Sequence, residues 1–79
     1  MINAGVNVNM KAFCVRLKKL REEHEFSQRK MAELLGISQP SYFNYESGAS
    51  EPTQENLIKL AEIFDVTIDY LVGRENYKI

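Results

Sequence analysis

The chain has 79 residues, ten Lys or Arg, eleven Asp or Glu and a formal net charge of −1. A chain of this length is expected to form one domain with a small core. It contains no apolar run near the roughly 20 residues that a membrane-spanning helix needs. Its start lacks the basic segment and apolar stretch of a secretory signal. A single cysteine excludes an internal disulfide, so we expect a reducing, cytoplasmic setting.

The ends of the chain differ in character from its middle. Residues 1–9 are uncharged and show no helical periodicity, so we expect a flexible N-terminal arm. Residues 10–73 are expected to form the domain, and residues 74–79 a C-terminal tail. The first helix is predicted over residues 11–23, where Phe13, Leu17 and Leu20 recur at helical spacing.

Two helices joined by a tight glycine turn are predicted next, over residues 28–35 and 39–47. Ser27 and Ser38 precede them as N-caps, because a serine hydroxyl accepts a hydrogen bond from a free amide of the first turn. Gly36 suits the left-handed conformation that ends the earlier helix. Two helices that meet steeply in this way are typical of a helix-turn-helix.

The pattern also predicts which faces of these helices are buried. The residues expected to face the core are Met31, Ala32, Leu34, Leu35, Tyr42 and Tyr45. Ala32 is small enough for the two helix backbones to approach. The later helix then turns Gln39, Ser41, Phe43 and Asn44 outward, and in a helix-turn-helix that face enters the DNA major groove.

Two further helices complete an all-α chain, over residues 54–64 and 68–72. Thr53 and Thr67 are their expected N-caps. Leu57, Leu60, Ala61 and Phe64 form the inner stripe of the longer helix.

The ordered motifs resemble those of the phage-repressor class of helix-turn-helix proteins, the Cro and lambda-repressor-like, or XRE, DNA-binding domains. The resemblance covers about residues 10–73. It rests on Arg-Leu-Lys-Lys-Leu-Arg at 16–21, Ser-Gln with Met-Ala-Glu-Leu-Leu-Gly-Ile-Ser-Gln at 27–39, Tyr-x-x-Tyr-Glu-x-Gly at 42–48, Pro52, and Leu-Ile-Lys-Leu-Ala-Glu-Ile-Phe-Asp-Val at 57–66. It implies a compact five-helix domain whose third helix contacts an operator.

The resemblance also implies roles at matching positions. Gln28 would bind a phosphate, Gln39 and Asn44 would face base edges, and Arg21 would form a structural salt bridge with Glu46. Amides suit base edges because Gln or Asn pairs bidentate with adenine. The full set of expected DNA contacts is Gln28, Arg29, Ser38, Gln39, Ser41, Phe43, Asn44 and Ser47.

The chain departs from the family where many relatives carry Arg or Lys, at Asn44, Ser47, Ala49 and Ser50. A monomer with fewer phosphate contacts should bind DNA weakly, and a homodimer would compensate by joining two modest sites. Phe43 replaces a small polar residue, and would touch either a thymine methyl group or a protein partner.

Two apolar residues in the C-terminal part of the chain bear on a dimer surface. Ile63 and Tyr70 are apolar where the family is usually polar. They either lie at the margin of the core or belong to a dimer interface.

The sequence predicts a binding protein and not an enzyme. It has no catalytic triad, phosphate-binding glycine loop or metal-ligand spacing, and no cofactor or small-molecule substrate is implied. Residues 11–30 hold seven basic and three acidic residues, whereas residues 51–79 hold three basic and six acidic ones, so DNA contact is expected on one side.

The expected function is a sequence-specific DNA-binding transcriptional regulator, a phage or mobile-element repressor that occupies an operator as a dimer. The alternative is the antitoxin of a toxin–antitoxin pair, or another protein-interaction module with the same fold.

Overall fold

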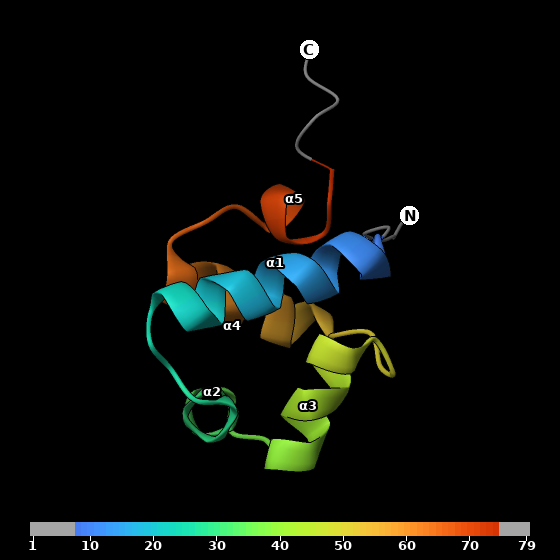
Figure 1. The fold of residues 1–79 in the computed structure, drawn as a ribbon. Coiled ribbons are helices and arrows are strands. Elements are labelled where there is room, and N and C mark those ends of the chain that lie inside the picture. Colours follow the sequence, from blue (N-terminus) through green and yellow to red (C-terminus); the bar gives the residue numbers. More distant parts are fainter. Residues whose placement is uncertain (1–7, 75–79) are drawn as a thin grey trace.

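Residues 8–74 are described by the computed structural model and contain five α-helices and no strand (Figure 1). The helices are α1 (Met10–Glu23), α2 (Gln28–Leu35), α3 (Gln39–Ser47), α4 (Gln54–Phe64) and α5 (Ile68–Leu71). The predicted all-α, five-helix class is confirmed. The bounds of α2, α3 and α4 are as predicted, while α1 begins one residue earlier and α5 ends one residue earlier. None of these helices combines the length and apolar character needed to cross a membrane.

The four predicted N-caps are confirmed. The side chains of Ser27, Ser38, Thr53 and Thr67 each accept a hydrogen bond from the backbone N–H three residues later. These bonds satisfy amides that a helix start leaves without a partner. The hydroxyl-bearing residues therefore set where α2, α3, α4 and α5 begin.

The start of α1 differs from the sequence prediction. Asn9, which we expected in the arm, is its N-cap and accepts from the N–H of Ala12 at 3.2 Å. The Asn9 N–H also donates to the carbonyl of Val72 at 3.0 Å, and Val8 packs against the core. The folded domain thus extends two residues before residue 10. The rest of the expected arm, residues 1–7, and tail residues 75–79 lie outside the described residues.

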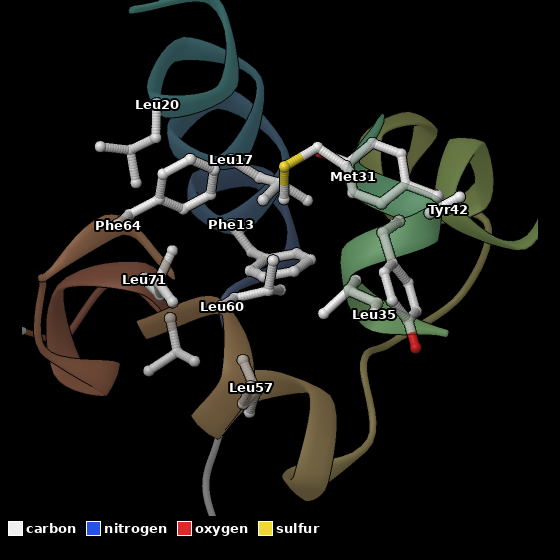
Figure 2. Close-up of a cluster of buried hydrophobic side chains, with 13 residues drawn as sticks. Phe13, Leu17, Leu20, Met31, Leu35, Tyr42, Leu57, Leu60, Phe64 and Leu71 are labelled. Atoms are coloured by element: carbon white, nitrogen blue, oxygen red, sulfur yellow. The ribbon is translucent and has the colours of Figure 1, made fainter. Parts of the chain in front are cut away.

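One core joins all five helices (Figure 2). Its buried apolar residues are Phe13, Leu17, Leu20, Met31, Ala32, Leu35, Tyr42, Tyr45, Leu57, Leu60, Phe64, Leu71 and Val72. In Figure 2 side chains from α1, from the α2–α3 pair and from α4–α5 converge on one volume. The predicted inward positions on α1, α3 and α4 are confirmed, with Ala61 only partly buried.

Leu34 is the core residue that we predicted wrongly, since its side chain is 40% exposed. Met31, Ala32 and Leu35 are the buried residues of α2. At about 100° per residue, Leu34 lies roughly 110° from the centre of that buried stripe. An eight-residue helix has one narrow inner face, and Leu34 falls outside it.

The helix pairs divide the molecule into two ends. α2 packs on α3 and α4 packs on α5, with α1 in contact with both α3 and α5. In Figure 1, α2 and α3 lie at the bottom of the view, α1 crosses the middle, and α5 lies at the top. Gly36, with φ of 71°, makes the left-handed turn between α2 and α3. The predicted helix-turn-helix therefore forms the end of the domain remote from α5.

Candidate nucleic-acid interface

The outward face of α3 carries the polar residues expected to contact bases. Gln39, Ser41 and Phe43 are exposed and Asn44 is half-buried, while Tyr42 and Tyr45 turn inward. Pro40 lies in the first turn, where backbone N–H groups have no acceptor within the helix, so the missing N–H of proline costs no hydrogen bond. The arrangement presents amide, hydroxyl and aromatic groups on the broad part of a nine-residue helix that Tyr42 and Tyr45 leave turned away from the core.

The serines around α3 serve the helix itself as well as its surface. The Ser38 hydroxyl accepts from the Ser41 N–H at 3.1 Å and donates to the Ser41 hydroxyl at 2.8 Å. The Ser47 hydroxyl donates to the carbonyl of Asn44 at 3.3 Å. All three serines are exposed, so their hydroxyls retain lone pairs that face solvent. Ser38 is thus first a cap and only secondarily a surface group.

Glu46 is the centre of a buried hydrogen-bond cluster that ties three helices together. Arg21 on α1 donates to its carboxylate from Nε at 2.5 Å and from Nη2 at 3.1 Å. The Tyr42 hydroxyl donates at 2.6 Å and Gln28 Nε2 on α2 donates at 3.1 Å. The side chains of Arg21 and Glu46 are 13% and 4% exposed. The predicted salt bridge between them is confirmed.

The ionisation of this cluster follows from its geometry. Burial raises the pKa of Glu46, but hydrogen bonds from Arg21, Tyr42 and Gln28 outweigh burial and hold the pKa below its usual value. The hydrogen bond to Glu46 raises the pKa of Arg21. Burial, followed by the hydrogen bond to Glu46, raises the pKa of Tyr42. At neutral pH the cluster therefore holds a charged pair and a neutral phenol.

Gln28 begins α2 as predicted, and its side chain makes a bond that the sequence did not predict. One N–H of its side-chain amide is directed inward to Glu46, so only the second N–H and the carbonyl oxygen remain for a ligand. The sequence pattern did not predict this bond or the bond from the Tyr42 hydroxyl to Glu46. The Tyr42 bond had a signal, since Tyr42 and Glu46 are four residues apart on one helix and residues at that spacing are neighbours. The Gln28 bond had none, because it depends on how α2 packs on α3.

Phe43 is the large apolar side chain on the outward face of α3, and it is 52% exposed. It lies beside an open notch of about 330 Å³ between α2 and α3. The notch is lined by Gln28, Gln39, Pro40 and Phe43. Two of these residues are amides and two offer only apolar side-chain atoms to the notch.

Positive charge near this face comes from the start of α2. Arg29 and Lys30 are exposed in its first turn, and Arg29 lies 3.9 Å from Glu33 in a solvated pair. α3 itself carries no Lys or Arg. The described residues 8–74 also contain no cluster of three or more His, Cys, Asp or Glu suited to a metal ion.

The two residues predicted for a dimer surface lie at the edge of the core. Ile63 and Tyr70 are half-buried and pack against it. The guanidinium of Arg16 stacks over the Tyr70 ring, 4.6 Å from its centroid. This placement accords with the alternative that they line the core margin, and a dimer surface there stays a prediction.

Two helices joined by a left-handed glycine, with a polar helix face held outward, define a helix-turn-helix domain. The family model described as Helix-turn-helix matches residues 17–71. The chain belongs to this family, in its Cro and lambda-repressor-like, or XRE, branch.

Relatives and solved structures agree with that assignment. The chain is 46% identical over 59 residues to the cryptic phage CTXphi transcriptional repressor RstR of Vibrio cholerae, covering 75% of this chain and 53% of RstR. A structure of the biofilm regulator SinR in complex with DNA matches with a TM-score of 0.67 at 25% identity, over 75% of this chain and 95% of SinR. The P22 c2 repressor shares the fold, with a TM-score of 0.74 at 24% identity over 80% of this chain and 96% of that one. The chain spans little more than half the length of the curated relatives it matches.

Proposed function

We propose that this protein is a sequence-specific DNA-binding transcriptional regulator that represses by occupying an operator as a homodimer. The observation that carries the proposal is the outward polar face of α3, with Gln39 and Asn44 on it, held against the domain by the Glu46 cluster. The family, the repressor RstR and the DNA-bound SinR support it. The protein acts by binding and performs no chemistry.

The dimensions and chemistry of α3 suit the major groove of DNA. An α-helix with its side chains is about 10–12 Å in diameter, and the major groove is about 12 Å wide, so α3 can enter it. The amides of Gln39 and Asn44 can pair with the N7 and N6 atoms of adenine. Ser41 and Ser47, with the exposed first turn of α2 that holds Arg29, supply contacts to phosphates.

The scarcity of basic residues near α3 argues for two copies on one operator. Most affinity for DNA comes from phosphate contacts, and the described part of the chain offers few near α3 beyond Arg29 and Lys30. Two linked sites gain affinity without a new contact. Ile63 on α4 and Tyr70 on α5 are the residues proposed for the dimer surface, and neither belongs to α3, the helix proposed to contact DNA. We place this regulator in the cytoplasm.

Selection of binding sites from random duplex DNA tests the proposal. Enrichment of a two-fold symmetric site, with half-sites about 34 Å apart, is expected for a dimer. Asn44→Ala and Gln39→Ala should each weaken binding to the selected site by about 1–3 kcal/mol, with little effect on random DNA. Gln54→Ala is a matched control, since Gln54 is an exposed amide on α4. Failure to enrich any site, or equal losses on random DNA, would refute base contacts by these amides.

One observation favours a second candidate function, the antitoxin of a toxin–antitoxin pair. Phe43 leaves half of an aromatic side chain in solvent on the face proposed for DNA. Exposed apolar groups often mark association with proteins. Co-expression with the product of the neighbouring gene tests this. A complex that Phe43→Ala abolishes would support the antitoxin, and a freely soluble neighbour with no complex would exclude it.

A further inference from the structure

Gln28 links the buried Glu46 cluster to the surface of the domain. Its side chain is half-buried, and one N–H of its amide donates to Glu46 at 3.1 Å. Gln28 also lines the open notch between α2 and α3, together with the exposed Gln39 and Phe43 of the outward α3 face. The same side chain therefore belongs to the internal cluster and to the surface proposed to meet DNA.

The carboxylate of Glu46 determines which end of the Gln28 amide faces inward. An ionised carboxylate accepts hydrogen bonds and donates none. Glu46 is ionised because it is paired with Arg21 in a buried salt bridge. The nitrogen end of the Gln28 amide must then turn toward Glu46, since the carbonyl end would bring two acceptor oxygens together. The second N–H stays outside this bond and is available to an acceptor on a ligand.

Glu46 is itself held at both carboxylate oxygens. Oε2 accepts from Arg21 Nε at 2.5 Å and from the Tyr42 hydroxyl at 2.6 Å, and Oε1 accepts from Arg21 Nη2 at 3.1 Å. Arg21 Nη1 also donates to the carbonyl of Phe26 at 2.9 Å, two residues before Gln28. The cluster thus holds both the backbone that enters α2 and the side chain of its first residue. Because the Glu46 side chain is 4% exposed, it can affect a ligand only through a neighbour.

The first turn of α2 suits a phosphate of the DNA backbone. The start of a helix attracts phosphate through its backbone N–H groups and its dipole. Arg29 and Lys30 are exposed in the same turn. The second N–H of Gln28 adds a donor at this place. An amide that is already ordered loses less conformational entropy on binding than one that rotates freely.

We propose that Glu46 is a positioning residue for DNA binding, whose bond to Gln28 orders the amide so that its second N–H donates to one phosphate in each operator half-site. This inference rests on the proposed function. It gives the cluster a role beyond stability, because a buried carboxylate on α3 then sets the strength of a contact made by α2. Glu46 itself stays out of reach of the DNA.

The test measures Kd for the selected operator in a cycle of variants. The Arg21→Met, Glu46→Leu double variant removes the carboxylate without leaving the Arg21 charge buried alone, so it is expected to fold, which circular dichroism checks. It should raise Kd about 2- to 12-fold, which corresponds to about 0.5–1.5 kcal/mol for ordering one side chain on binding. Gln28→Ala should also raise Kd. Adding the double substitution to Gln28→Ala should raise Kd no further, because the contact on which Glu46 acts is already gone.

A matched background separates positioning from a general effect on the fold. Asn44 lies on α3 and is not a member of the cluster, so the double substitution should raise Kd by the same factor in Asn44→Ala as in the parent. Operators with a methylphosphonate in place of a single phosphate locate the contact. At one phosphate per half-site, this replacement should weaken binding of the parent more than binding of Gln28→Ala or of the double variant.

The parent protein without DNA gives an independent measurement. NMR relaxation of side-chain amide groups should show a more ordered amide at Gln28 than at Gln54, an exposed residue of α4. A Gln28 amide as mobile as that of Gln54 would overturn the inference and leave the proposed function standing. A double variant that binds like the parent, or that loses as much affinity without Gln28 as with it, would do the same. A parent that selects no operator would refute the proposed function and the inference with it.

Discussion

Loss of the Glu46 carboxylate is predicted to destabilise the domain more than any exposed ion pair can. The Glu46→Ala variant leaves the buried Tyr42 hydroxyl without its acceptor and the Arg21 guanidinium with only the carbonyl of Phe26, and it frees Gln28. Glu46 is 4% exposed and Arg21 is 13% exposed, so water replaces the lost bonds poorly. Breaking a buried pair in this way costs about 3–5 kcal/mol. For a domain of this size the melting temperature should fall by roughly 12–40 °C, at about 4–8 °C per kcal/mol.

Urea unfolding followed by circular dichroism at low temperature gives the free energy of unfolding for each variant. The double variant Arg21→Met with Glu46→Leu should recover much of the loss, because both charges are then removed together. The control is Glu23→Ala, which breaks the exposed Lys19–Glu23 pair and should cost at most about 1 kcal/mol. If Glu46→Ala costs no more than this control, or if the Arg21 and Glu46 changes simply add, the cluster does not hold the three helices together as reasoned.

Three further predictions concern stability. Since the pKa of Glu46 is lower in the folded than in the unfolded state, its stabilisation is present above the unfolded value, about 4.3, and is lost as pH falls through the folded value; urea midpoints across this range should fall more steeply for the parent than for Glu46→Gln, and parallel curves would contradict this. Gly73→Ala should lower the melting temperature more than Gly36→Ala, although both glycines have positive φ, because a Cβ at Gly73 would lie 2.8 Å from the Cβ of Ala12 and a Cβ at Gly36 would have no atom within 4 Å. Equal losses of melting temperature would show that the contact at Gly73 relaxes freely. Tyr45→Phe should cost about 1–3 kcal/mol, because the buried Asn56 amide donates to the Tyr45 hydroxyl at 2.9 Å; a denaturation midpoint equal to that of the parent would mean that Asn56 finds another acceptor.

Local signals in the sequence were enough to predict most of the fold. Hydroxyl caps such as Ser27 and Thr53 mark helix starts, and Gly36 marks the turn between α2 and α3, because each acts within a few residues of itself. The errors fall where the outcome depends on packing between distant segments. The local pattern assigns Asn9 to the arm. Its bond to Val72 joins residues far apart in the chain, so no local signal indicates it.

The outward position of several α3 residues was predictable, whereas the contacts around them were not. The helix-turn-helix pattern predicts that Tyr42 and Tyr45 turn toward the core and that Gln39 turns outward, and the structure has them so. The bond between Gln28 and Glu46 could not be predicted, because it joins residues 18 positions apart through a helix crossing. The notch beside Phe43 has the same origin, as its walls come from two helices. Contacts between helices, not within them, carry the information that the linear pattern lacks.

The backbone N–H of Asn9 donates to the carbonyl of Val72 at 3.0 Å, so the first and last described segments of the domain lie side by side. The chain therefore enters the domain near Val8 and leaves it near Arg74 at neighbouring places on the surface. Such a domain can be inserted into a surface loop of a larger protein without distorting the segments on either side. For the same reason a short peptide linker between these positions should cyclise the backbone with little distortion. Circular permutants with new termini elsewhere on the surface can then be made.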